Sequence, residues 1–246
     1  MNAQISLSRL AMYHGELDAL PLLRAMILDE FKGEIALITS FGADASLLLS
    51  MVAEVDASTP VLFLETQKHF PETLAYAREL AARLGLKNMH WLKPDPALVA
   101  RTDPGGDLWS TKPNRCCWLR KVEPLDRTVA ELGLKALITG RKRFQTPERA
   151  ALETIELDDK HIFRINPLAL WDKDRQKKET LARKLPEHPL VAQGYLSIGC
   201  APCTKPVAAG EDPRAGRWAH TIGIDEEQKT ECGIHLPASE VSNWSV

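Results

Sequence analysis

The stretch Glu34–Val55, EIALITSFGADASLLLSMVAEV, decides the fold class. Its first part, Ile35–Thr39, is a continuous apolar run of strand length, and its last part, Ala45–Val55, has the apolar character of a buried helix. Between them lies SFGADAS, a turn that contains Gly42. A buried strand that passes through a short turn into a helix is the repeating unit of a parallel α/β sheet.

The same alternation continues along the chain. Further strands are predicted at Val61–Leu64, within NMHWLKP (88–94), at Ala136–Thr139 and within HIFRINPL (161–168). Helices are predicted at 70–86, near 117–131 with Pro124 as a kink or division, and at 172–184 as a solvated helix. Residues 94–115 read as a polar loop. We therefore expect an α/β protein whose parallel sheet is flanked by helices.

Three segments are expected along the chain. Residues 1–33 are expected to form an N-terminal helical segment, residues 34–204 an α/β domain, and residues 205–246 a C-terminal tail. The chain has 246 residues, of which 44% are hydrophobic, so it can bury a full core. Its 31 Lys and Arg against 33 Asp and Glu give no reason to expect a nucleic-acid or membrane-surface partner. Without a signal-peptide layout or a transmembrane-length run, a soluble, cytoplasmic protein is expected.

Polar and small residues follow the strands where a parallel sheet binds its ligands. The turn after the first strand offers hydroxyls, a glycine and the free N–H groups of a helix start, which suit a phosphate or sulfate group. An ordinary turn capped by Asp44 or Ser46 is the alternative. The turns after the second strand, LETQKH, and the fourth, TGRKRF, lead to the same crevice, where a basic run favours a polyanion over a solvated charge run. The candidate ligand contacts are Ser40, Phe41, Gly42, Ser46, Gly140 and Arg141.

Five cysteines form a set of four with one left over. RCCWLRK and GCAPC supply the pairs Cys116–Cys117 and Cys200–Cys203. In a reducing compartment such pairs indicate a metal centre more than disulfides, and a large iron–sulfur cluster suits adjacent cysteines better than a single zinc ion does. A thioredoxin-like CxxC is the alternative, but such a motif begins a helix after a strand. Lys121 follows Cys117 by one helical turn and is expected to face the same centre and an anionic ligand.

The motifs together resemble one enzyme family. SFGADAS, RCCWLRKVEPL, YLSIGCAPCTKPV, GEDPRAGRW and KTECGIH are similar to the iron–sulfur branch of the adenylyl-sulfate and phosphoadenylyl-sulfate reductases. The resemblance runs from about residue 33 to residue 236. It implies an adenine-nucleotide α-hydrolase-like fold with an ATP-pyrophosphatase-like loop.

The resemblance also implies a chemistry. A 4Fe-4S cluster would be held by Cys116, Cys117, Cys200 and Cys203, and Cys232 would be a nucleophile on a mobile tail. The substrate would be adenosine 5′-phosphosulfate (APS), the products sulfite and AMP, and the reductant thioredoxin or glutaredoxin. Arg214, Arg217 and His235 would contact the substrate, and a homo-oligomer is expected.

Two departures from the family pattern stand out. The segment that compares with the family's LDTG reads LETQ here, with Glu65 and Gln67, and AHTIGIDEEQ (219–228) is expected to lengthen the tether of Cys232. Three alternatives to an enzyme that takes APS alone remain open. They are an enzyme that also, or instead, takes the 3′-phosphorylated substrate, an ATP-dependent adenylating enzyme of the same fold such as an RNA-thiolating one, and a zinc-stapled binding module. Near-neutral charge and the fifth cysteine argue against the last.

Overall fold

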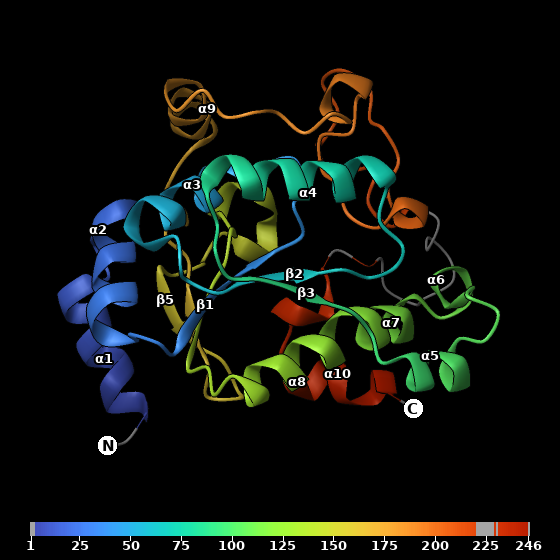
Figure 1. Cartoon of the computed structure of the whole chain (residues 1–246), viewed down its shortest axis with the longest axis horizontal. Helices are drawn as coiled ribbons and strands as arrows, with labels where there is room; N and C mark the ends of the chain where they lie inside the picture. Colours follow the sequence, from blue (N-terminus) through green and yellow to red (C-terminus); the bar gives the residue numbers. More distant parts are fainter. Residues whose placement is uncertain (1–2, 220–228, 230, 246) are drawn as a thin grey trace.

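The computed structural model describes residues 3–219, 229 and 231–245 (Figure 1). Within these residues one sheet has six strands in the order β3-β2-β1-β4-β6-β5. All neighbouring strands run parallel except the pair β5 and β6, which is antiparallel. The strands are β1 (Ile35–Thr39), β2 (Val61–Leu64), β3 (Met89–Leu92), β4 (Ala136–Ile138), β5 (Ile155–Leu157) and β6 (Phe163–Ile165). The predicted parallel α/β sheet is thus confirmed.

Both faces of the sheet are buried, because alternate residues of each central strand enter two different cores. Leu37 and Phe63 pack with helices on one face, whereas Ile38, Leu62 and Leu64 pack with Leu125 and Leu134 on the other. Continuous apolar strands are the sequence signature of such a doubly covered sheet.

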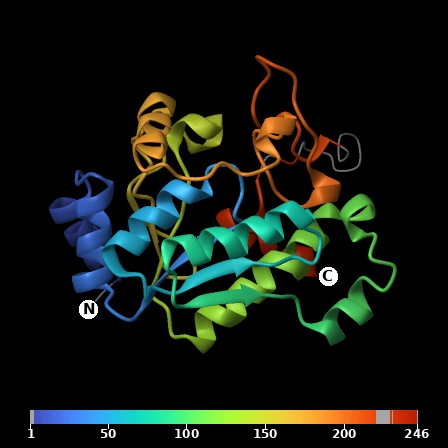
Figure 2. The ribbon, with the colours of Figure 1, turned by 45° about the horizontal axis from the view of Figure 1, so that its top comes forward.

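Helices cover both faces of the sheet. Figures 1 and 2 show α3 (Ala45–Asp56) and α4 (Pro71–Leu84) on one face, with α7 (Pro113–Cys117) and α8 (Glu123–Glu131) on the opposite face. The N-terminal segment is helical as predicted and consists of α1 (Ala3–His14), α2 (Ala19–Arg24) and the π-helical turn η1 (Ala25–Glu30). The predicted polar helix is α9 (Lys173–Ala182), which buries none of its residues. No helix in the described part of the chain is long and apolar enough to span a membrane.

The prediction of a polar loop at 94–115 is wrong. The segment contains α5 (Pro96–Thr102) and α6 (Leu108–Thr111), and α7 begins within it. Pro96 and Pro113 each stand in the first turn of their helices, where a missing N–H costs nothing, and Asp95 Oδ1 accepts a hydrogen bond from Leu98 N at 2.8 Å. Short helices without an apolar stripe escape periodicity arguments.

Pro124 marks a change of helix type. Between α7 and α8 the chain forms a π-helical turn, η2 (Trp118–Val122), so the helical path is divided just before the proline as expected.

The remaining elements are short: the 3₁₀ turns η3 (Arg143–Gln145), η4 (Pro147–Arg149), η5 (Val191–Gln193), η6 (Ala201–Cys203), η8 (Gly233–His235) and η9 (Ser242–Ser245), and the helix α10 (Ala238–Val241). Residues 220–228, which include most of the segment expected to lengthen the tether, lie outside the described residues.

Candidate active site

The strand order reverses direction at β1, the position at which open parallel sheets bind ligands in a crevice beyond the strand ends. The turns after β1 and β4 lie at this position. An ion pair joins these turns: Lys142 Nζ lies 3.4 Å from Asp44 Oδ2. Asp44 is the N-cap residue of α3 but makes no side-chain capping hydrogen bond. Its carboxylate is therefore paired with Lys142, and it does not cap the first N–H groups of α3.

The turn after β1 presents mainly backbone to the crevice. Phe41 has φ +47°, its N–H donates to Thr39 Oγ1 at 3.0 Å, and its ring packs edge-on against Phe63 at 5.1 Å between centroids. A buried ring and a left-handed backbone together turn the chain sharply here. Ser40 is exposed, whereas Ser46 is buried and hydrogen-bonds with the Tyr76 hydroxyl.

Gly42 is required by a close approach of the chain. A Cβ atom at this position would lie 2.9 Å from the carbonyl oxygen of Ile198, a contact that real side chains essentially never make. Ile198 lies two residues before Cys200. The segment with the second cysteine pair therefore passes directly against the turn after β1.

The cysteine pairs meet in one pocket, which we call the thiol pocket. Cys116, Cys117, Cys200 and Cys203 line it together with Lys68, Lys121 and Trp218. The turn after β2 holds the second pair: Ala201 N donates to Lys68 O at 2.7 Å, and Thr66 Oγ1 lies 3.3 Å from Cys200 Sγ. Two segments more than eighty residues apart in sequence thus deliver four thiols to one place, as the sequence predicts.

The chemistry of these thiols fits an iron–sulfur centre. All four are buried and none forms a disulfide. Burial, reinforced by the neighbouring thiolates, raises the pKa of Cys116 and of Cys203 to about 12, and burial likewise raises the pKa of Cys117. Such thiols ionise together only beside a strong positive charge, which a soft metal centre supplies. No three His, Cys, Asp or Glu side chains of the described residues are arranged to hold a metal ion. The fit to a cluster is therefore one of donor type and burial, not of ligand geometry.

Lys121 lines the thiol pocket and interacts electrostatically with Cys232. Burial acts to lower the pKa of its ammonium group, but the charges of Cys232, Cys200 and Cys117 outweigh burial and raise the pKa above its ordinary value. Lys121 is therefore a fixed positive charge that faces the sulfur atoms, in the orientation that its spacing from Cys117 predicts.

Cys232 is buried in the same region. It packs with Cys200, Cys203 and Trp218, so all five cysteines converge. The Arg217 guanidinium lies 4.4 Å from the centre of the Trp218 ring and packs on Gly199, where a Cβ atom would be 2.4 Å from Arg217 Nη2. Burial lowers the pKa of Arg217, and its buried Nε has no hydrogen-bond partner. A desolvated guanidinium with an unused donor is suited to an anion.

His235 lies among four arginines, which we call the arginine cluster: Arg141, Arg149, Arg164 and Arg214. Burial is the main reason that the pKa of His235 falls well below its ordinary value, and the four guanidinium charges add to it. The imidazole is therefore neutral at pH 7, and its buried Nδ1 has no hydrogen-bond partner. The charges of the predicted contacts Arg141 and Arg214 thus act on the third predicted contact, His235.

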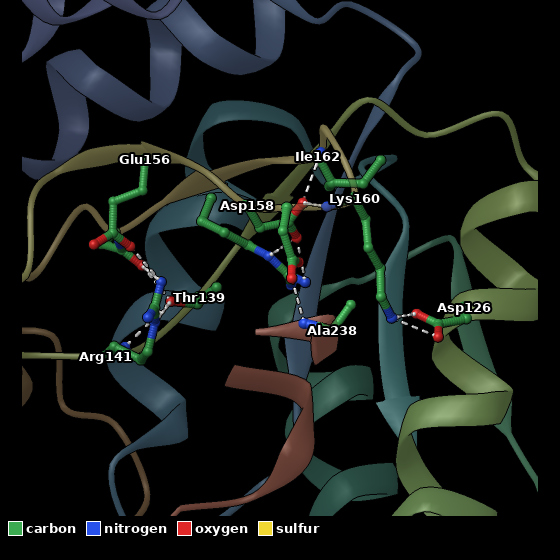
Figure 3. Close-up of polar contacts among 11 residues, drawn as sticks. Asp126, Thr139, Arg141, Glu156, Asp158, Lys160, Ile162 and Ala238 are labelled. Carbon is green, nitrogen blue, oxygen red and sulfur yellow. Dashed lines mark hydrogen bonds and ion pairs between the residues drawn. The ribbon is translucent and has the colours of Figure 1, made fainter. Parts of the chain in front are cut away.

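Arg141 is oriented by Glu156 of β5 and by two residues that directly follow β4 and β6, Thr139 and Asn166 (Figure 3). Its Nη2 donates to Glu156 Oε2 at 2.7 Å and to Asn166 Oδ1 at 3.2 Å, and its Nε donates to Thr139 Oγ1 at 3.2 Å. The turn between β5 and β6 also holds the chain end, because Ala238 N donates to Asp159 Oδ2. Gly140 is exposed beside Arg141.

The sequence analysis missed three charged residues of this site. Arg149 and Arg164 belong to the arginine cluster, and Arg120 is buried, where it donates to Asp103 Oδ2 at 2.6 Å. Only the positive charge of these arginines could have indicated their role, because their partners are distant in sequence. The departure at Gln67 is also explained: the residue adopts φ +60°, a conformation that favours glycine, and its Oε1 accepts from Arg120 Nη1 at 3.2 Å.

The fold and the site define a class: an α/β protein with a ligand crevice at its strand ends and a thiol centre beside it. Comparison with known proteins gives the family. Residues 34–206 match the phosphoadenosine phosphosulfate reductase domain, and the chain belongs to this family. An adenosine 5′-phosphosulfate reductase from Mesorhizobium japonicum is 50% identical over 229 residues, which cover 93% of this chain and 87% of the relative.

Solved structures agree with this fold. The phosphate complex of phosphoadenylyl-sulfate reductase from Candida auris has a TM-score of 0.71 and 29% identity, covering 83% of this chain and 98% of that one. FMN adenylyltransferase from Candida glabrata shares the fold alone, with a TM-score of 0.55, 16% identity and coverage of 98% and 90%. The predicted adenine-nucleotide α-hydrolase-like fold is thus confirmed.

Proposed function

We propose that this protein reduces adenosine 5′-phosphosulfate to sulfite and AMP in sulfate assimilation, on the route to cysteine. The observation that carries the proposal is the convergence of Cys232, Lys121 and Arg217 beside the thiol pocket, at the strand ends where the family's nucleotide substrate binds. The name of the 50%-identical relative supports the same substrate.

The crevice is suited to an adenylated anion. The start of α3 offers N–H groups that its N-cap side chain leaves uncapped, and two arginines and Lys121 offer positive charge. Phe41 would contribute through its backbone only, because its ring is buried. We assign the substrate contacts to Ser40, Phe41, Gly42, Ser46, Lys121, Gly140, Arg141, Arg214, Arg217 and His235.

The reaction follows from the chemistry of the mixed anhydride. The Cys232 thiolate attacks the sulfur of APS, an S–S bond forms, the S–O bond to the phosphate breaks and AMP leaves. Lys121 and Arg217 would neutralise negative charge as it shifts to the leaving phosphate. The product is an S-sulfonate on Cys232.

Two thiols complete the cycle. One thiolate of thioredoxin or glutaredoxin attacks the Cys232 sulfur, sulfite leaves with its bonding electrons, and the second thiol resolves the mixed disulfide. The partner thus supplies two electrons and is oxidised to a disulfide. Because Cys232 is buried beside Cys200 and Cys203, it must move outward to meet this partner.

The four thiols of the thiol pocket would hold a 4Fe-4S cluster. When bound, the cluster supplies order and charge next to Lys121 rather than electrons, which the thiols of the partner provide.

Residues 34–204 would form the reductase domain and residues 205–246 the segment that carries the nucleophile, with residues 1–33 as a helical addition. We place the enzyme in the cytoplasm as a homo-oligomer.

A reductase for the 3′-phosphorylated substrate is the second candidate, since the similar Candida auris structure carries that name. The test is to purify the protein without oxygen, record its visible spectrum and iron content, and measure sulfite released from each substrate with thioredoxin. A brown protein that prefers APS is expected. Faster turnover of the 3′-phosphorylated compound would favour the second candidate, and zinc in place of iron would contradict the cluster.

A further inference from the structure

Glu231 stands directly before Cys232, and the proposed reaction gives it no role. Its carboxylate is buried between two members of the arginine cluster: Glu231 Oε1 lies 2.5 Å from Arg149 Nη2 and 3.4 Å from Arg214 Nη2. The side chains of Glu231 and Arg149 are only 9% and 10% exposed. A buried ion pair of this kind is stable only while both partners are present.

The local backbone conformation links the position of the Glu231 carboxylate to that of the Cys232 sulfur. Cys232 is extended, with φ −92° and ψ 140°, and side chains of successive extended residues point to opposite sides of the chain. Glu231 faces the arginine cluster, while Cys232 faces Cys200, Cys203 and Trp218. Fixing the carboxylate on one side therefore fixes the sulfur on the other.

Arg149 and Arg214 are not equivalent partners. The contact with Arg149 is the shorter one, and Arg149 sits on the turn η4, outside the segment that carries Cys232. Burial lowers the pKa of Arg149 while Glu231 opposes this effect, so each charge offsets the desolvation of the other. Arg214 makes the longer contact, and it lies on the segment 205–219 that leads toward Cys232 rather than on η4.

We propose that Glu231 is a positioning residue, whose ion pair with Arg149 docks the Cys232 segment with the sulfur beside Lys121. The inference rests on the proposed role of Cys232 as nucleophile. Glu231 touches neither the substrate nor the reacting sulfur. Its carboxylate holds the closed position of a segment that must open after each S-sulfonate forms.

The first test measures docking without substrate. Full-length protein, purified without oxygen, is treated with iodoacetamide, and alkylation of the Cys232 peptide is followed by mass spectrometry. In Glu231→Gln, which keeps shape but loses charge, Cys232 should react about tenfold faster or more. Glu231→Asp should fall between, and Glu240→Gln, an exposed glutamate of the same segment, should match the unchanged protein. An unchanged rate in Glu231→Gln overturns the proposal.

A second pair of variants separates docking from misfolding. Arg149→Gln should raise the alkylation rate as Glu231→Gln does, and the double variant should react no faster than either single one. Multiplied effects in the double variant would show that the two residues act independently and would overturn the ion pair as the anchor.

Steady-state kinetics distinguish positioning from competition with substrate. Positioning predicts that Glu231→Gln lowers kcat about tenfold or more with little change in KM for APS. If Glu231 instead blocks the arginines, KM should fall and kcat should hold, which overturns the proposal. An unchanged protein that releases no sulfite would refute the proposed function, while the alkylation result would still decide the docking role.

Discussion

Lys142 and Asp44 join the turns after β4 and β1, with Lys142 Nζ 3.4 Å from Asp44 Oδ2. The ammonium group is buried, and burial lowers its pKa although Asp44 opposes the shift. Two adjacent basic residues after β4 therefore have different partners. Lys142 pairs with Asp44 between the two turns, whereas its neighbour Arg141 belongs to the arginine cluster. A solvated charge run, the alternative considered for TGRKRF, does not describe either residue.

Replacing Cys232 by serine should abolish sulfite release, because a hydroxyl at neutral pH cannot take the place of a thiolate. The iron content and visible spectrum should remain those of the unchanged protein, since the other four thiols line the pocket without it. Both are measured on one anaerobic preparation. Normal turnover in Cys232→Ser would remove this residue from the nucleophile role.

Replacing Cys203 by serine should lower the iron content as well as the activity. Iron should be lost from the protein and activity should fall with it, because a weak hydroxyl ligand replaces a thiolate. Iron analysis and the visible spectrum provide the measurement, with Cys232→Ser as the matched control. Undiminished iron would exclude Cys203 from the ligand set.

Lys121→Gln should lower kcat by about a hundredfold, the usual loss when one preorganised charge at a reacting centre is removed. Lys121→Arg keeps the charge and should recover part of the rate. Lys177→Gln, on the solvated helix α9, removes a positive charge far from the pocket's lining residues and should leave kcat unchanged. Equal losses in Lys121→Gln and Lys121→Arg would indicate a packing role instead.

Gly42→Ala should destabilise the protein by about 1–3 kcal/mol, the common cost of a forced backbone shift. Its new Cβ would lie 2.9 Å from the Ile198 carbonyl oxygen, which a flexible side chain cannot relieve. Gly140→Ala brings a Cβ only to 3.7 Å from Leu48 Cδ2 and should unfold at the unchanged temperature. Thermal unfolding of the two variants makes the comparison, and equal stability would contradict the close approach.

Acid stability should depend on His188. This buried imidazole lies 3.0 Å from Thr73 Oγ1 and accepts from Leu190 N, and burial lowers its pKa to about 4. The unfolded chain, with an ordinary pKa of 6.5, binds the proton first. Stability from the neutral ring is therefore complete above pH 6.5 and is lost as the pH falls toward 4, by about 3 kcal/mol at most.

Urea unfolding at pH 7 and pH 5 tests this expectation. The loss between the two values should shrink in His188→Gln and should persist in His161→Asn, which changes an exposed histidine. An identical pH dependence in His188→Gln and the unchanged protein would assign the acid sensitivity to other groups.

The sequence predicts those parts of the molecule that depend on local pattern. Apolar runs predicted β1, β2, β3, β4 and β6, and the spacing of cysteines predicted the thiol pocket. β5 was missed because Ile155–Leu157 is a three-residue edge strand that only pairing with β6 defines. The contact of Arg149 with Glu231 joins residues 82 positions apart and carries no periodic signal. Long-range charge pairing is a property of the folded chain alone.

The contact of Gly42 with Ile198 also constrains how this protein can diverge. The turn after β1 and the segment that leads to Cys200 occupy adjoining space, so neither can change its backbone alone. Among relatives, a side chain at position 42 should therefore occur only together with a different path of residues 197–199. The turn after β1 and the cysteine segment would then be inherited as one unit, although more than 150 residues separate them in the chain.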